Sequence, residues 1–143
     1  MKKILLGTSI LVFGVSTFAS LTYSDNHIAH LKTCSPYSEV YVAKIPTQDP
    51  NTPLLHLRST EKVLGWNNGK CKTSSIVYSD DMHMEILTTD CAFSKTQLNS
   101  IVSKMEQVNA GNSQLGKALQ DEITQYVQDG ITCKVNNLLE IMQ

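Results

Sequence analysis

The amino-acid sequence predicts an α+β fold in which a small antiparallel sheet of about four strands precedes a C-terminal helical hairpin. Three observations support this fold class. Alternating segments rich in Val and Tyr fill the first half of the chain, an Asn-Gly pair marks a tight hairpin, and hydrophobic residues recur at helical spacing after residue 93. Once an N-terminal leader is removed, the 143-residue chain has the length of one domain with a modest core.

Residues 1–19 have the pattern of a secretory signal peptide. Lys2 and Lys3 precede an apolar run that ends at the small residues Ala19 and Ser20. The alternative is an uncleaved anchor, but glycine and hydroxyl residues interrupt the run, and it is shorter than the roughly 20 apolar residues of a membrane span. We therefore expect cleavage after Ala19, a periplasmic or secreted location, and no stable membrane span after cleavage.

The charge pattern argues against nucleic acid as a partner. The chain has 12 basic and 13 acidic side chains, and loss of Lys2 and Lys3 lowers its net charge from −1 to −3. The chain is weakly acidic and its sequence contains no cluster of basic residues, so neither nucleic acid nor an anionic membrane surface is the expected ligand.

Four cysteines follow the leader, and an even number in a small exported domain predicts two disulfides. Their spacing includes no C-x-x-C, so neither a redox dithiol nor a zinc ribbon is indicated. The sequence alone leaves all three pairings open for these cysteines: Cys34, Cys71, Cys91 and Cys133.

We expect a flexible N-terminal segment over residues 20–33 and a single domain over residues 34–143. The strands are predicted at residues 39–45, 54–66, 71–78 and 82–89. Between the first two strands, three prolines indicate a surface loop, because proline lacks an amide donor for the ladder.

Asn68-Gly69 favours a type I′ turn between the second and third strands. The alternation of the next two strands suggests a register with Cys71 opposite Cys91, in which Ile76 also faces Ile86 and Tyr78 faces Met84. This register would allow a Cys71–Cys91 disulfide. Disulfides that join Cys34 to Cys71 and Cys91 to Cys133 would fit the predicted sheet nearly as well, because the first three cysteines fall near one end of the sheet.

The hydrophobic period changes after Cys91. Ser94 and Gln97 have the spacing of a capping box at the start of a helix. Ser113 can cap a second helix, which Gly130 would end. The tail then brings its cysteine back toward the sheet as a short strand or a helical turn.

The motifs "LKTCSPYS", Gly65 with "GKC" at residues 69–71, and "DGITC" occur in this order. The order resembles that of a group of small exported bacterial proteins with no assigned function, in which C-x-P-Y leads into a strand hairpin, a G-x-x-x-G-K-C turn and a C-terminal helical region. The resemblance covers residues 31–134, although the proline loop and Lys72-Thr73 depart from the group. It implies an α+β, disulfide-containing periplasmic or secreted domain, and it implies no activity.

The stretch "SDDMHMEI" contains the best metal-binding candidates: Met82, His83, Met84 and Glu85. His83 and Glu85 would share one strand face, and methionine beside histidine suits copper. A solvated turn and strand face explain these residues better than a metal site does, so we expect no metal and no other cofactor. Trp66 and Tyr41 are the candidate binding residues, because aromatic side chains often anchor a partner.

No catalytic pattern stands out, since the sequence lacks G-x-S-x-G, H-E-x-x-H and a phosphate-binding glycine loop. The sequence therefore favours a non-enzymatic interaction module whose partner is another envelope or host protein. A small-ligand or copper carrier and an enzyme with an unrecognised site are the alternatives.

Overall fold

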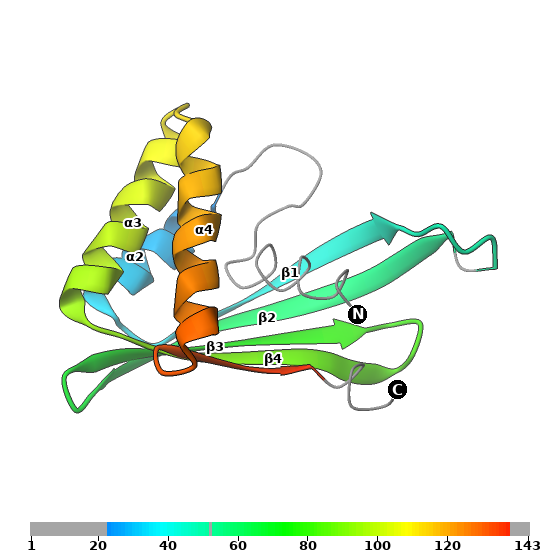
Figure 1. Cartoon of the computed structure of the whole chain (residues 1–143), viewed down its shortest axis with the longest axis horizontal. Helices are drawn as coiled ribbons and strands as arrows, with labels where there is room; N and C mark the ends of the chain where they lie inside the picture. Colours follow the sequence, from blue (N-terminus) through cyan, green and yellow to red (C-terminus); the bar gives the residue numbers. More distant parts are fainter. Residues whose placement is uncertain (1–22, 52, 138–143) are drawn as a thin grey trace.

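The computed structural model describes residues 23–51 and 53–137. The predicted signal peptide lies outside these residues. Within the described residues, a five-stranded antiparallel sheet in the order β1-β2-β3-β4-β5 forms one layer, and three helices form the other (Figure 1). The strands are β1 (Tyr37–Pro46), β2 (Leu54–Asn67), β3 (Lys70–Ser79), β4 (Met84–Phe93) and β5 (Cys133–Asn137). The predicted α+β class is confirmed, and the tail adds a fifth strand.

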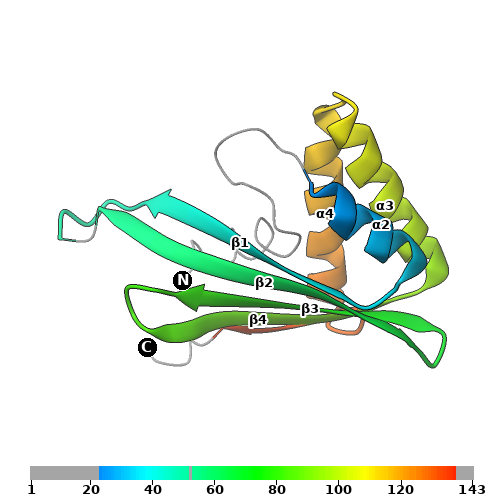
Figure 2. The same cartoon turned by 180° about the vertical axis from the view of Figure 1, so that it is seen from behind.

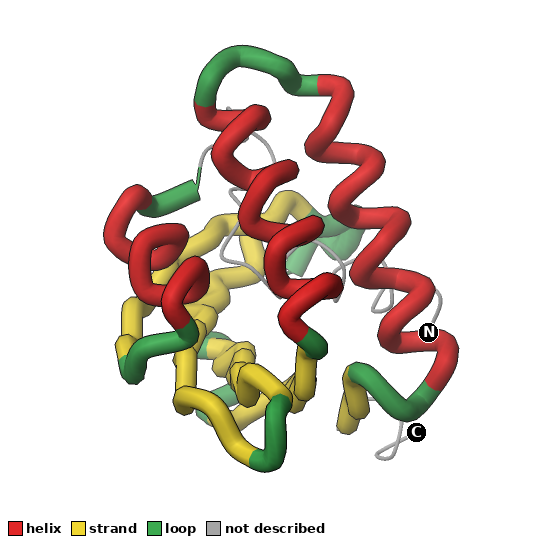
Figure 3. Tube along the Cα trace, turned by 90° about the vertical axis from the view of Figure 1, so that its left-hand side faces the viewer, coloured by secondary structure: helices red, strands yellow, loops and turns green. Residues whose placement is uncertain are grey.

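The helices stand side by side on one face of the sheet, over the half that contains the β2–β3 hairpin (Figures 2 and 3). They are α2 (Asp25–Thr33), α3 (Lys95–Asn109) and α4 (Gln114–Asp129). None of the described helices is long and apolar enough to cross a membrane. The predicted C-terminal helical hairpin is thus the α3–α4 pair.

Helix α2 replaces most of the segment that was predicted to be flexible, and that prediction is wrong from Asp25 onward. Ser24 caps the helix by accepting a hydrogen bond from the His27 amide, and the buried side chains of Ile28 and Leu31 attach it to the core. The polar composition of this stretch concealed the helix, because so few of its side chains are apolar.

The β2–β3 hairpin turns at Asn68 and Gly69, whose φ angles of 54° and 76° agree with the predicted type I′ turn. In β2, before this turn, the β2–β3 register shifts by one residue between Val63 and Gly65. Gly65 has a φ of 113°, so this bulge requires a residue without a side chain.

The β3–β4 register differs from the predicted one. Cys71 lies opposite Phe93 rather than Cys91, because β4 continues to Phe93. As far as Val77 the shift is two residues, so the two cysteines share a face without being neighbours. A bulge between Val77 and Tyr78 then reduces the shift to one residue. Two further predicted pairs are wrong as well: Ile76 with Ile86, and Tyr78 with Met84.

The disulfides join Cys34 to Cys71 and Cys91 to Cys133, with Cα–Cα distances of 5.9 and 4.1 Å. The first connects the end of α2 to the start of β3. The second connects directly opposed residues of β4 and β5. This is one of the three pairings that the sequence left open, and it excludes the Cys71–Cys91 bond that the predicted register would allow.

Apolar side chains form two separate clusters. The larger one lies between the helices and the sheet, contains all four cysteines, and includes Phe93, Leu98 and Ile101. The smaller one occupies the half of the sheet that extends beyond the helices, around Leu57 and Val77. Polar side chains on the same face of the sheet separate the two clusters.

Candidate functional site

A hollow of about 570 Å³ extends from the end of β2, across β3 and β4, to the loop that follows α4. Three large apolar side chains at this hollow are unusually exposed: Leu64 at 54%, Trp66 at 45% and Ile131 at 83%. Isolated exposed apolar residues are ordinary, but several around one depression are typical of an interaction surface. We call this depression the Trp66 hollow.

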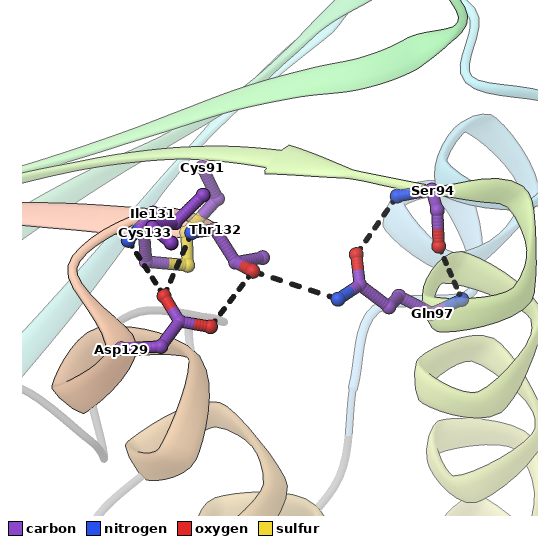
Figure 4. The surroundings of a disulfide bond; sticks show 7 residues. All are labelled: Cys91, Ser94, Gln97, Asp129, Ile131, Thr132 and Cys133. Carbon is purple, nitrogen blue, oxygen red and sulfur yellow. Dashed lines mark hydrogen bonds between the residues drawn. A yellow bond between two sulfur atoms is a disulfide. The ribbon is translucent and has the colours of Figure 1, made fainter.

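Ile131 is exposed on a loop that is firmly held. The Asp129 Oδ1 atom accepts hydrogen bonds from the amides of Ile131 and Thr132, at 2.6 and 2.8 Å, and Oδ2 accepts from the Thr132 hydroxyl at 3.0 Å (Figure 4). The amide donors lower the pKa of Asp129, because they stabilise its charged form. The isoleucine is therefore presented to solvent in a defined position.

This loop is also attached to its surroundings on both sides. The Gln97 side chain, part of the capping box of α3, lies 3.5 Å from the Thr132 hydroxyl (Figure 4). Cys133, the next residue, is bonded to Cys91. The starts of α3 and β5 and the end of α4 thus meet beneath Ile131.

Trp66 also lines the hollow. It lies opposite Cys71 in the sheet, and its indole Nε1 donates a hydrogen bond of 3.2 Å to the carbonyl of Thr33 at the end of α2. The indole is therefore oriented by a polar contact while almost half of its surface stays exposed. The sequence named Trp66 as a candidate, but it did not indicate Leu64 or Ile131.

The hollow also contains charged residues. Lys72, Lys134 and Asp90 line it, and Asp90 lies opposite Lys134 in the β4–β5 pairing. Within the described part of the chain, no ion pair within 4.0 Å joins these three side chains. The hollow has an excess of one positive charge.

A second set of polar residues crosses the sheet beneath α2. Glu39, Glu61, Ser75 and Thr89 are successive cross-strand partners on β1, β2, β3 and β4, and we call them the polar row. The Glu61 carboxylate accepts hydrogen bonds from Ser59, at 2.6 Å, and from Ser75. The row lies on the face that the helices cover, between the two apolar clusters. The sequence analysis did not identify Glu61, although its alternation with Leu57 and Val63 is a signal that would place it on this face.

The two carboxyl groups of the row differ in their ionisation. Burial acts to raise the pKa of Glu39, but hydroxyl donors outweigh it and lower that pKa overall: Tyr41, Tyr37 and Ser24. Burial dominates at Glu61 and raises its pKa to about 8, although Ser59 and Ser75 oppose the shift. At neutral pH the row therefore contains one ionised and one protonated carboxyl group.

His27 of α2 and Thr89 of β4 line a cavity of about 10 Å³ beside Glu61. Among the described residues, His27 Nδ1 and the Thr89 hydroxyl have no hydrogen-bond partner. Burial lowers the pKa of His27, so the imidazole stays neutral. A cavity of this size holds about one water molecule, which leaves no room for an organic substrate.

Tyr41, the other predicted binding residue, belongs to this interior. Its hydroxyl donates to Glu39, and its ring lies 6.5 Å from that of His27 between centroids. The side chain is only partly exposed, so we do not assign it to the Trp66 hollow.

The metal candidates do not share a strand face, because His83 lies in a turn before β4 and has a φ of 54°. The nearby acids contact β2 instead: Asp81 accepts from the His56 amide at 2.7 Å, and Asp80 pairs with Arg58 at 2.8 Å. Within the described residues no group of three His, Cys, Asp or Glu side chains could hold a metal ion. The carrier and enzyme alternatives stay predictions, and no observation favours either.

Comparison of the chain with protein-family models, curated proteins and solved structures found no match. The resemblance to small exported bacterial proteins therefore remains a prediction from the motifs.

Proposed function

We propose that the chain is an exported, non-enzymatic interaction module that binds an acidic segment of another envelope or host protein in the Trp66 hollow. The observation that carries this proposal is Ile131, which is 83% exposed on a loop held by three hydrogen bonds to Asp129 and by an adjacent disulfide. Because these contacts already hold the backbone of the loop, it loses little conformational entropy when a partner covers the Ile131 side chain.

The side chains around the hollow suit a small protein interface. Trp66 and Ile131 line the hollow as exposed apolar anchors, together with three charged residues. Binding energy in such interfaces concentrates in a few large apolar or aromatic side chains surrounded by polar groups.

The lysines favour an acidic partner. Lys72 and Lys134 outnumber Asp90, and no ion pair within the described residues neutralises them. A carboxylate on the partner would gain charge complementarity, which mainly increases the association rate and excludes basic partners.

Site-specific photocrosslinking in the producing cells tests this function. A photoreactive residue at position 131 should form an adduct with one other protein, and the same residue at Gln125, an exposed position of α4, should not. Peptide mapping of the adduct should identify an acidic contact segment. The adduct should fall at least about tenfold with Trp66→Ala and with combined Lys72→Glu and Lys134→Glu, because these changes remove an anchor and reverse the charge.

Equal adducts from both positions, or an adduct that survives these substitutions, would contradict the proposal. So would the absence of any protein adduct at position 131. Circular dichroism and intact disulfides in each variant establish that the fold is retained.

A further inference from the structure

Strand β1 forms a long open edge of the sheet. It has ten residues and, among the described residues, pairs only with β2. The opposite edge, β5, has five residues and is tied to β4 by a disulfide. An edge strand presents unpaired N–H and C=O groups, which can pair with a strand of another molecule.

The side chains of β1 that face away from the helices are all exposed. They include Val40, at 57%, and Val42, at 70%. Their cross-strand partners on β2 are Thr60 and Arg58, and basic residues flank this pair on β2. Two neighbouring valines therefore stand exposed on an otherwise polar surface, beside the open edge.

We propose that a second copy of this chain pairs with β1, antiparallel, about a two-fold axis at Tyr41, so that the two sheets become one continuous sheet. This interface does not involve the Trp66 hollow. The contact is self-complementary, as a two-fold symmetric contact must be.

The side-chain pattern selects this register. Residues opposed across the new edge must lie on the same face, so the axis passes through a single residue. An axis at Tyr41 places Val40 of each copy opposite Val42 of the other, and Ser38 opposite Lys44. An axis at Val40 or Val42 would instead place one valine of each copy opposite Ser38 or Lys44. Of the three registers, only the one centred on Tyr41 brings all the valines opposite one another. It also keeps the two Lys44 side chains apart.

Sedimentation equilibrium of the disulfide-bonded mature protein tests the proposal. The wild type should reach the mass of a dimer as its concentration rises. Combined Val40→Lys and Val42→Lys should raise the dissociation constant at least about tenfold, because charges replace the apolar cross-strand pairs. Leu64→Lys is the matched control: Leu64 is also an exposed apolar residue, at 54%, but it lies at the hollow, so dimerisation should be unchanged.

Hydrogen exchange provides a second measurement that needs no substitution. Amides of β1 should become more protected with increasing wild-type concentration, while those of β5 should not change. A monomer at all concentrations, a dimer that survives the double lysine variant, or protection that is absent from β1 would overturn the proposal. A monomer whose β1 becomes protected only on binding a different protein would assign the edge to that partner and would equally overturn the dimer.

Discussion

A carboxyl group without a paired cation lies in the middle of the sheet. Glu61 is 2% exposed, and among the described residues no salt bridge reaches it. The groups that face it are neutral or acidic: His27 from α2, Glu39 from β1, Ser75 from β3 and Thr89 from β4. Burial therefore disfavours the charged form with no cation to offset it, and the pKa of Glu61 rises to about 8.

The raised pKa makes the stability of the fold depend on pH. From its ordinary pKa of 4.5 up to about 8, Glu61 binds more protons in the folded state than in the unfolded state, so its contribution to stability falls as pH rises. His27 acts oppositely, but only below its ordinary pKa of 6.5, because its folded-state pKa is lowered. The effect of Glu61 is therefore clearest between pH 6.5 and 8.

In that window, the free energy of unfolding of the wild type should decrease by about 1 kcal/mol per pH unit. Glu61→Gln should flatten this dependence, because the amide cannot ionise and its oxygen can still accept the serine hydroxyls. Urea titrations at pH 6.5, 7.2 and 8 would measure the slopes. Glu85→Gln, at an exposed position, is the control and should keep the wild-type slope. Equal slopes for wild type and Glu61→Gln would show that Glu61 is already ionised.

At the scale of the elements, two serines that look alike in the sequence have different roles. Ser94 forms a complete capping box with Gln97 at the start of α3. Ser113 precedes α4 in the same way, but its backbone is already helical and its side chain makes no capping hydrogen bond. Sequence predicted both helix starts, and only the local backbone conformation distinguishes the two residues.

We expect Ser94→Ala to lower the free energy of unfolding by about 1 kcal/mol, because the Gln97 amide loses its acceptor, the Ser94 hydroxyl. Ser113→Ala should change it by less than about 0.5 kcal/mol, because no capping hydrogen bond is lost. Chemical denaturation of both variants at one pH makes the comparison. A loss of similar size at both positions would contradict the distinction between them.

Helix α2 shows why an element can escape sequence analysis. Its apolar contacts come from Ile28 and Leu31, which are too few to produce a clear helical period. His27 is also buried, but a hydrophobicity pattern counts histidine as polar. Tertiary contacts supply the remaining stabilisation of the helix. The rings of Tyr37 and His30 stack with their centroids 4.4 Å apart, and the disulfide of Cys34 connects the end of the helix to β3.

At the scale of the whole molecule, the disulfides join segments that are distant in sequence. They span separations of 37 and 42 residues, so each restricts the unfolded chain to a similar degree. In the chain-entropy account each is worth about 4 kcal/mol, a large part of the stability of a domain this size.

Removing either disulfide by paired Cys→Ser substitution should therefore lower the free energy of unfolding by a similar amount, about 2 to 5 kcal/mol. The local effects should differ. Loss of Cys34–Cys71 should speed hydrogen exchange in α2, whereas loss of Cys91–Cys133 should speed it in β5. Urea denaturation and exchange with mass spectrometry measure both quantities. A loss below about 1 kcal/mol for both pairs, or identical exchange patterns, would refute this account. Denaturing alkylation of the wild type should find no free thiol.

The sequence by itself determined the α+β class, the first four strands, the Asn68-Gly69 turn and the two C-terminal helices, because alternation, turn chemistry and capping are local properties. Strand register and disulfide pairing needed the tertiary structure, since a bulge and the length of β4 decide which residues meet. The same holds for both surfaces proposed here. Ile131 is exposed because Asp129 and the Cys91–Cys133 bond hold its loop, and β1 is an open edge only because β2 through β5 assemble on its other side.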